Sequence, residues 1–495
     1  MRGIRISTSH ISVVAIQCIW ILHVILSTHY SNNTRLLWKL IILALSLGIV
    51  SKGAAQEYTP GAPNSPQAQP SPPAATPQEF WLPEMPEQGE ETDTMKLQDQ
   101  ELTAPQTPPA DALAENSEPG HVFNKWKVIP YASLQTTFDD NIFISAQNPQ
   151  SDVYTTIAAG MAAGWGAVQR NLSESAGYFR QADTPKLEIN PVEEGNYAFA
   201  NYTASQTLFA DHTSQNSINQ DVSLSGEWRF EKILFNTSVR YQTLSDIDID
   251  IGGRVNHDLL TAKLTAAYPI SEKISDAVDF SRTSNYYPTA LNSTDTSINN
   301  FVNYQATGKL NTGVGVKLGT LDVQTSPGQV YEQILLRGTY LAAGKLSFSA
   351  TAGLEARQIQ GNNHFDPVFT FGAVYSVAEQ TTLYLDAFRQ TFSSAVIAGE
   401  NIATTGVTLR VRQRCFQKIY LTLQGGYQHG QYQELVQTAL SSRVDDSLDF
   451  RASLSFDYTK WITMELSYEY RKSHSTESTS SFAENLFTLQ LIVFF

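Results

Sequence analysis

The feature that most constrains the fold is an alternation of apolar and polar residues that recurs from Lys125 to the end of the chain. Residues 221–230, DVSLSGEWRF, place two sets of side chains on opposite faces of an extended chain: Val222, Leu224, Trp228 and Phe230 against Ser223, Ser225, Glu227 and Arg229. A period of two is typical of a strand with one apolar face. Because no stretch of this region keeps a 3.6-residue period, we expect an all-β fold.

The lengths of the strands and of their connections separate a membrane barrel from a soluble β-sandwich. The alternating stretches run for about ten to sixteen residues, whereas strands of globular proteins usually have about five or six. Short polar connections, such as 230–233 and 269–274, alternate with longer ones, such as 244–253 and 283–297. Short turns at one end and long loops at the other are typical of outer-membrane barrels. The pattern predicts a transmembrane antiparallel β-barrel of about 18 strands (range about 14 to 18) over residues 121–495.

The tryptophans of this region fall at one end of the predicted barrel. Trp126, Trp165, Trp228 and Trp461 all lie at the end with short turns. Indole rings favour the membrane–water interface, where barrels carry aromatic girdles. We therefore expect these four side chains to form an interfacial girdle.

The last stretch of the chain, ENLFTLQLIVFF (484–495), is a strand with a fully apolar face and an aromatic terminus. It resembles the C-terminal signal of bacterial outer-membrane proteins. The resemblance implies that the barrel-assembly machinery binds this strand, which then pairs with the first strand to close the sheet. Closure would leave no unpaired backbone groups in lipid. The apolar face that we expect to contact the hydrocarbon consists of Phe487, Leu489, Leu491, Val493 and Phe495.

A second resemblance covers residues 131–166. This stretch is similar to the start of the outer-membrane β-barrel porin 2 families, in which an aromatic-Asp-x-Asn-hydrophobic motif precedes a Ser-Asp strand and a glycine-rich strand. The matching positions here are Phe138, Asp140, Asn141, Ile142, Phe143, Ser151, Asp152, Gly160 and Gly164. The resemblance implies an outer-membrane location in a Gram-negative bacterium and says little about the solute.

Two segments precede the predicted barrel. Residues 1–55 contain a signal-like pattern, in which basic residues precede the apolar run 40–50 and small residues lead to a predicted cleavage site near Ala55. Residues 56–120 hold 13 of the 21 prolines and 12 acidic residues against Lys96 alone. Such a composition cannot bury enough apolar surface to fold. We expect a disordered linker in the periplasm; a tether that binds a periplasmic partner is the alternative.

Several classes of function are disfavoured. The net charge is −15 and lysines and arginines are not clustered, which disfavours a nucleic-acid partner. With only Cys18 and Cys415, a disulfide framework or a cysteine zinc site is excluded. We find no catalytic motif and expect no enzyme, cofactor or metal. The stretch 246–252, DIDIDIG, hints at a divalent-cation loop, but its spacing favours a strand end with aspartates in water and isoleucines in lipid.

The strongest candidate for a functional feature is a row of arginines at period two, Arg410, Arg412 and Arg414. They share one face, and that face cannot contact lipid because an arginine at the membrane midplane costs about 2–4 kcal/mol. Either they form a basic ladder that shapes the field in the lumen, or they pair with acids of neighbouring strands such as Asp386; the two readings are compatible. The other predicted pore-lining residues are Asp449, Arg451, Asp457, Glu465 and Glu469.

A barrel of this size is wide enough for an aqueous lumen unless it is plugged. The first hypothesis is a porin-like channel for passive passage of small hydrophilic solutes. Export of a polysaccharide and a barrel-anchored structural or adhesive protein are the alternatives. The expected partners are outer-membrane lipid, the assembly machinery and small solutes, and a homo-oligomer is compatible with the sequence.

Overall fold

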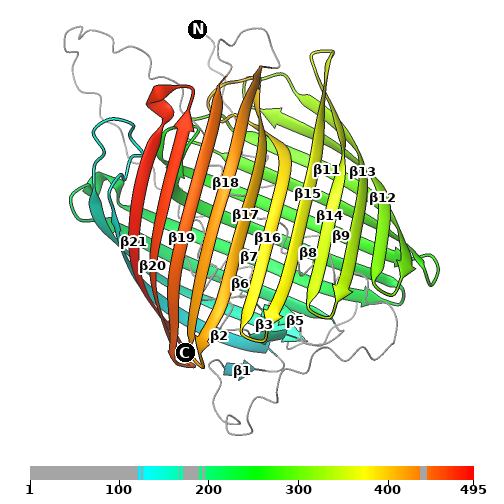
Figure 1. Cartoon of the computed structure of the whole chain (residues 1–495), viewed down its shortest axis with the longest axis horizontal. Coiled ribbons are helices and arrows are strands. Elements are labelled where there is room, and N and C mark those ends of the chain that lie inside the picture. Colours follow the sequence, from blue (N-terminus) through cyan, green and yellow to red (C-terminus); the bar gives the residue numbers. More distant parts are fainter. Residues whose placement is uncertain (1–120, 124–125, 167, 171–188, 192–195, 435–442) are drawn as a thin grey trace, which may run out of the picture. The chain divides into compact units, whose positions relative to one another are not determined.

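The computed structural model describes residues 121–123, 126–166, 168–170, 189–191, 196–434 and 443–495. The predicted leader and linker lie outside these residues. Within them, strands at least 13 residues long form one closed antiparallel barrel of 18 strands, as predicted (Figure 1). No helix among the described residues is both long and apolar enough to cross a membrane.

The barrel strands follow one another in chain order. They are β2 (Trp126–Asp139), β3 (Asp152–Gly166), β6 (Tyr197–Phe209), β7 (Ser217–Phe230), β8 (Ile233–Asp248), β9 (Gly253–Pro269), β10 (Ile274–Tyr286), β11 (Ser293–Thr307), β12 (Leu310–Val323), β13 (Gln329–Ala343), β14 (Leu346–Ile359), β15 (Asn362–Ala378), β16 (Thr381–Ser393), β17 (Glu400–Phe416), β18 (Ile419–Glu434), β19 (Val444–Thr459), β20 (Ile462–Ser475) and β21 (Phe482–Phe494).

Three short strands stand apart from this series. β1 (His121–Phe123) pairs with the start of β2, and β4 (Val168–Arg170) pairs with β5 (Ile189–Pro191) in the connection between β3 and β6. Two short 3-10 turns lie in connections between barrel strands: Thr213–Gln215 between β6 and β7, and Ser478–Ser480 between β20 and β21.

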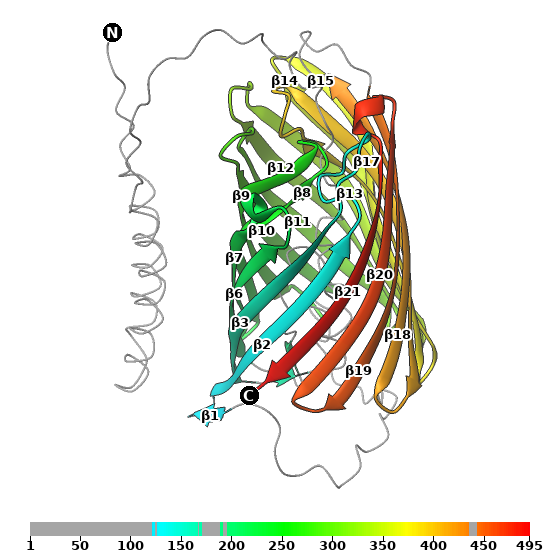
Figure 2. The same ribbon diagram turned by 90° about the vertical axis from the view of Figure 1, so that its left-hand side faces the viewer.

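The last strand pairs with the first and closes the sheet. The register of β2 against β21 runs from Tyr131 opposite Phe494 to Asp139 opposite Leu486. Figure 2 shows β2 and β21 side by side along this seam. The backbone N–H of Phe495 adds a hydrogen bond to the carbonyl oxygen of Pro130 at 2.9 Å. Closure therefore extends to the last residue.

Each strand has an apolar outer face and a polar or packed inner face. On β13, Ile334 is 68% exposed and Leu336 is 61% exposed, whereas Tyr331 between β12 and β14 is 2% exposed. The phenol of Tyr131 of β2 reaches across β3 and hydrogen-bonds Asn201 and Thr203 of β6. The face of the sheet that carries these buried side chains is the one that lines the interior of the barrel. The alternation predicted from the sequence is the alternation between the two surfaces of the barrel wall.

The two ends of the barrel differ. At the end that holds Phe495, which we call the turn end, pairs of strands are joined by tight turns such as Gly308–Lys309 and Gly344–Lys345. The other end, the loop end, has shorter connections than predicted. Residues 244–248 and 293–297 belong to strands, which leaves 249–252 and 287–292 as connections. These strand ends are rich in aspartate and serine, and their polarity makes them look like loops in the sequence.

The four tryptophans lie at the turn end, where the sequence places them. Trp126 pairs with Trp165 across β2 and β3, Trp228 pairs with Phe235, and Trp461 lies in the turn before β20. Their role as an interfacial girdle remains a prediction.

Candidate pore mouth and lumen

The hairpin between β8 and β9 leaves the barrel wall at the loop end and crosses toward the opposite side. We call residues 246–254 the tip. Arg254 of the tip lies over the rings of Tyr154 and Phe209, at 5.7 and 5.1 Å from their centroids, although β9 pairs with neither β3 nor β6. Ile247 and Ile249 pack against other parts of the chain, namely Ile144 and Phe482.

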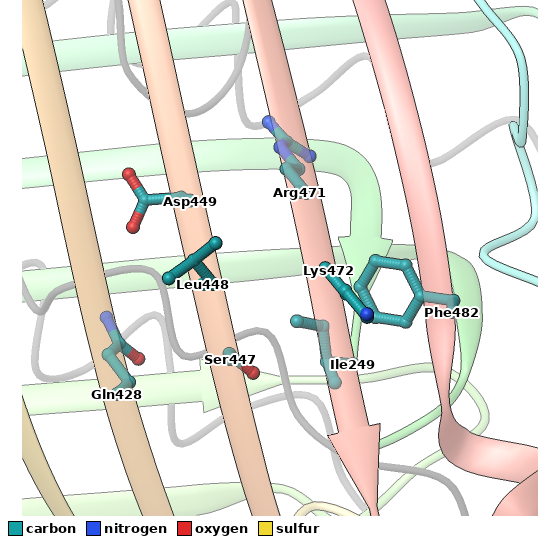
Figure 3. Close-up of a pocket in the computed structure, with 8 residues that line it drawn as sticks. All are labelled: Ile249, Gln428, Ser447, Leu448, Asp449, Arg471, Lys472 and Phe482. Atoms are coloured by element: carbon teal, nitrogen blue, oxygen red, sulfur yellow. The ribbon is translucent and has the colours of Figure 1, made fainter.

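The far side of the tip reaches the wall formed by β18 to β21. Figure 3 shows Ile249 beside Phe482, behind the strands drawn in front. A small pocket separates the tip from this wall. Its lining residues are Ile249, Gln428, Ser447, Leu448, Asp449, Arg471, Lys472 and Phe482. Because β8 and β21 are several strands apart around the barrel, a contact between them spans the mouth.

A second segment folds over the mouth from another part of the wall. We call residues 394–401, between β16 and the start of β17, the crossing segment. The side chains of Asn401 and Gln329 exchange two hydrogen bonds, at 2.8 and 3.1 Å, although β17 and β13 are not neighbours. Gln329 also accepts a hydrogen bond from Arg357 of β14 at 3.0 Å. These contacts hold the crossing segment inward.

The tip and the crossing segment meet at the carboxylate of Asp250. It accepts hydrogen bonds from the hydroxyl of Ser394 at 2.9 Å and from the backbone N–H of Ala395 at 2.6 Å. The hydroxyl of Tyr432, from β18, lies 3.4 Å from the other carboxylate oxygen. Asp250 is 1% exposed, and burial, followed by the charge of Asp248, raises its pKa to about 8. The loop end is thus closed over part of its width by two segments joined through a buried acid.

The reading of 246–252 as a strand end with aspartates in water and isoleucines in lipid is wrong. Asp248 is buried and accepts hydrogen bonds from the backbone of Ile251 and from the hydroxyl of Tyr287, each at 3.1 Å. Ile247 and Ile249 are also buried. Because the tip turns into the mouth, both of its faces find protein partners. In the described residues no group of three or more His, Cys, Asp or Glu side chains has the geometry of a metal site.

The three arginines of β17 lie on its inner face toward the turn end. Arg410 donates to Gln424 at 3.2 Å and lies over Tyr384 at 5.7 Å, and Arg412 lies over Tyr420 at 5.0 Å. The side chain of Asp386 is near enough to Arg410 for their charges to interact. Arg414 pairs with Tyr420 in the β17–β18 register, two residues before Phe416 ends the strand. The row begins nine residues along β17 from Asn401, the last residue of the crossing segment.

The other predicted lining residues form a second, mainly acidic surface on β19 and β20. Arg451 pairs with Glu465 at 3.0 Å and with Glu469 at 3.6 Å. Asp449 accepts a hydrogen bond from Gln424 at 3.4 Å, and Asp457 accepts one from Thr463 at 2.8 Å. All five occupy alternate positions of one face, opposite the exposed apolar residues of the same strands. The structure therefore brings these residues together, while their role in a pore remains a proposal.

Two members of this surface were missed as site residues. Arg471 pairs with Glu469 at 2.7 Å and with Glu484 at 3.4 Å, so the network continues onto β21. Glu484 is fully buried on the inner face. The signal in the sequence is the polar side of the last strand, where Glu484 shares a face with Thr488 and Gln490.

The motif that resembles the porin 2 families lies at the seam between β2 and β21. Asn141 donates to the carbonyl oxygens of Ala483 and Ser145, at 3.0 and 3.1 Å. Asp140 accepts hydrogen bonds from the backbone and the side chain of Asn485, both at 2.7 Å. The motif therefore binds the connection after β2 to the start of β21.

The outer-facing residues of β21 match the apolar face expected for it. Phe487 and Leu489 are 51% and 61% exposed, and Phe495 is 53% exposed. Leu491 and Val493 lie on the same face and are half-buried. Whether assembly machinery binds this face remains a prediction.

Comparison with known proteins identifies no family. No family model matches the chain, and no curated protein matches it. Solved structures that resemble it include OpdK of Pseudomonas aeruginosa, crystallised with vanillate (9% identity, 74% of this chain and 99% of that chain, TM-score 0.39), and a BenF-like porin from Pseudomonas fluorescens (10%, 74% and 99%, TM-score 0.41). The siderophore receptor PirA of Pseudomonas aeruginosa is also similar (8%, 74% and 80%, TM-score 0.37). At these identities and scores we infer neither family nor solute from the likeness, and the resemblance to the porin 2 families stays a prediction.

Proposed function

We propose that this chain is an outer-membrane channel through which small hydrophilic solutes diffuse passively. The observation that carries the proposal is the division of the wall into two surfaces. Large apolar side chains such as Ile334 and Leu336 face outward, whereas the inner face holds the arginine row and the network around Arg451. An apolar exterior is favourable in lipid, and charged groups on the interior require water.

The closed sheet supports the membrane location. In a bilayer every backbone polar group needs a partner within the protein, and a barrel without an edge meets this requirement. By the usual orientation of such barrels, the turn end would face the periplasm and the loop end the outside. The leader would direct export, and residues 56–120 would remain in the periplasm as a linker.

The inner wall supports selection by charge. The row Arg410, Arg412 and Arg414 lies on β17, and the acids Glu465 and Glu469 lie on β20, so a passing solute would meet opposite charges on nearby parts of the wall. Charged side chains of both signs shape the field in a water-filled pore. The inferred cargo is therefore polar and small.

Conductance of the purified full chain in planar bilayers tests the proposal. We expect discrete conductance steps that persist at constant voltage. The recordings cover pH 6 to 9, because the buried Asp250 at the mouth has a pKa of about 8 and its ionisation state changes within this range. A chain that inserts, shown by heat-modifiable mobility, yet gives no steps across this range would contradict the channel. Silence of that kind would favour an anchor or an export function instead.

A further inference from the structure

We propose that Asp250 is a latch: its protonated side chain holds the tip and the crossing segment together, and its ionisation releases them, so that flux through the mouth rises with pH. The inference rests on the proposed channel function and concerns the regulation of the same passage.

The latch joins two segments that come from distant parts of the wall. The tip belongs to β8 and β9, and the crossing segment lies between β16 and β17. Asp250 bonds both the hydroxyl of Ser394 and the backbone of Ala395. Ser394 in turn accepts from the backbone N–H groups of Val396 and Ile397, at 3.1 and 3.0 Å. One carboxyl group thus orders the start of the crossing segment.

The same contact is sealed by apolar packing. Val255 and Tyr287 form a cluster with Ala395, with Ile251 and Ala290 packed against it. Water is excluded from Asp250, which is 1% exposed. A carboxylate in such a site is costly, whereas a carboxylic acid keeps an acceptor for Ser394 and Ala395 and gains a proton that it can donate to a hydroxyl such as that of Tyr432.

The charged groups around Asp250 do not offset its burial: Asp248 opposes its ionisation and Arg443 favours it. Asp248 lies on the tip, and His257 of β9 stacks on Tyr287. From the opposite wall come Arg443 and Asp445, which pair with each other at 2.9 Å. Tyr432 interacts with the charges of Asp250, Arg443 and Asp445, and with that of Glu400. Arg443 is therefore shared between acids, and its charge only partly offsets the burial that raises the pKa of Asp250.

The direction of the pH effect follows from the two states of the mouth. In the closed mouth the pKa of Asp250 is about 8, and in an open, hydrated mouth it would return toward its usual 3.8. The closed form therefore binds the proton more tightly. The proton therefore stabilises the closed mouth fully below the pKa of the open state, and this stabilisation is lost as pH rises to the pKa of the closed state. Between the two pKa values the ratio of closed to open mouths falls by up to tenfold for each pH unit. Opening is expected on the alkaline side of neutrality.

Bilayer recordings of matched variants test the latch. The wild-type open probability should rise at least tenfold from pH 6 to pH 9. Asp250→Asn keeps an acceptor without the charge and should stay closed at both values, whereas Asp250→Ala should be open at both. Asp322→Asn, at an exposed position of β12 near the loop end, should follow the wild type. A flat wild-type profile, or an Asp250→Asn channel that opens with pH as the wild type does, would overturn the latch.

An accessibility measurement separates the latch from the channel function. Ile249→Cys, in a chain whose Cys18 and Cys415 are serines, is labelled with a charged methanethiosulfonate. Its rate is divided by the rate of Ala146→Cys, at an exposed position of the connection after β2, in the same background. The ratio should rise at least tenfold from pH 6 to pH 9, and adding Asp250→Asn should abolish the rise. A constant ratio overturns the latch even if the channel conducts, and a rising ratio in a silent barrel supports the latch while the channel function fails.

Discussion

The side-chain amide of Asn141 donates to the carbonyl oxygen of Ala483, 342 residues later in the chain, at 3.0 Å. The same amide donates to Ser145, and its oxygen accepts from the backbone of Ser145 at 2.9 Å. A single residue beyond the first barrel strand therefore orders its own connection and binds it to the last strand.

Replacing Asn141 with alanine should weaken the seam. Each lost hydrogen bond contributes about 0.5–1.5 kcal/mol, and the carbonyl of Ala483 would lose a partner. We expect the barrel to lose its compact electrophoretic mobility at a lower temperature than the wild type. Asn363→Ala, at an exposed position of β15, is the matched control. Identical melting of the two variants would show that the amide has no role in the seam.

Replacing Arg410, Arg412 and Arg414 with serine should shift the ion selectivity toward cations, because three positive charges leave the inner face while the acids of β19 and β20 stay. The reversal potential under a salt gradient measures the shift. A matched variant carries serine in place of Lys309 and Lys345, which lie in turns outside the wall. If the triple variant and the turn variant have the same reversal potential, the arginines do not act on permeating ions.

An arginine should be tolerated on the inner face of β13 and not on its outer face. Leu336→Arg places a charge at the middle of the strand on the lipid side and should lower the free energy of unfolding by about 2–4 kcal/mol. Gln333→Arg keeps a donor toward Glu355, which Gln333 contacts at 2.6 Å, and should cost far less. Denaturant unfolding in lipid vesicles compares them. Equal losses would mean that the exposed face of β13 does not meet hydrocarbon.

Deletion of Phe495 should reduce the yield of assembled barrel in cells. The deletion removes the backbone hydrogen bond to Pro130 and the exposed aromatic ring that directly follows β21. Phe495→Tyr preserves both and should assemble normally. The fraction of the chain with heat-modifiable mobility in outer-membrane preparations is the readout, and a normal fraction for the deletion would argue against a terminal assembly signal.

The barrel wall could be predicted because its rules are local. Successive side chains of a strand face opposite surfaces. This alternation makes Leu224 apolar and Ser223 polar in the sequence, and it makes Leu336 exposed and Tyr331 buried in the structure. The number of strands, the closing pair and the end at which the tryptophans lie all follow from this pattern and from the lengths of the connections.

The mouth could not be predicted because its partners are distant in the sequence. Asp248 and Asp250 have the same spacing as residues at an ordinary strand end, and nothing near them indicates that Ser394 and Tyr287 will cover them. Likewise Glu484 was not recognised as part of the charged wall because its partner, Arg471, lies on another strand. Local periodicity determines which face a side chain occupies but not which part of the chain lies opposite.

The join between the tip and the crossing segment has a consequence for biogenesis. Asp250 precedes Ser394 and Tyr432 in the chain by more than 140 residues. Its carboxyl group can form hydrogen bonds with them only after β16 to β18 have joined the sheet. An unfinished barrel would therefore have a hairpin with an uncapped acid and an unobstructed interior. Joining of the tip to the crossing segment would therefore be one of the last events of maturation.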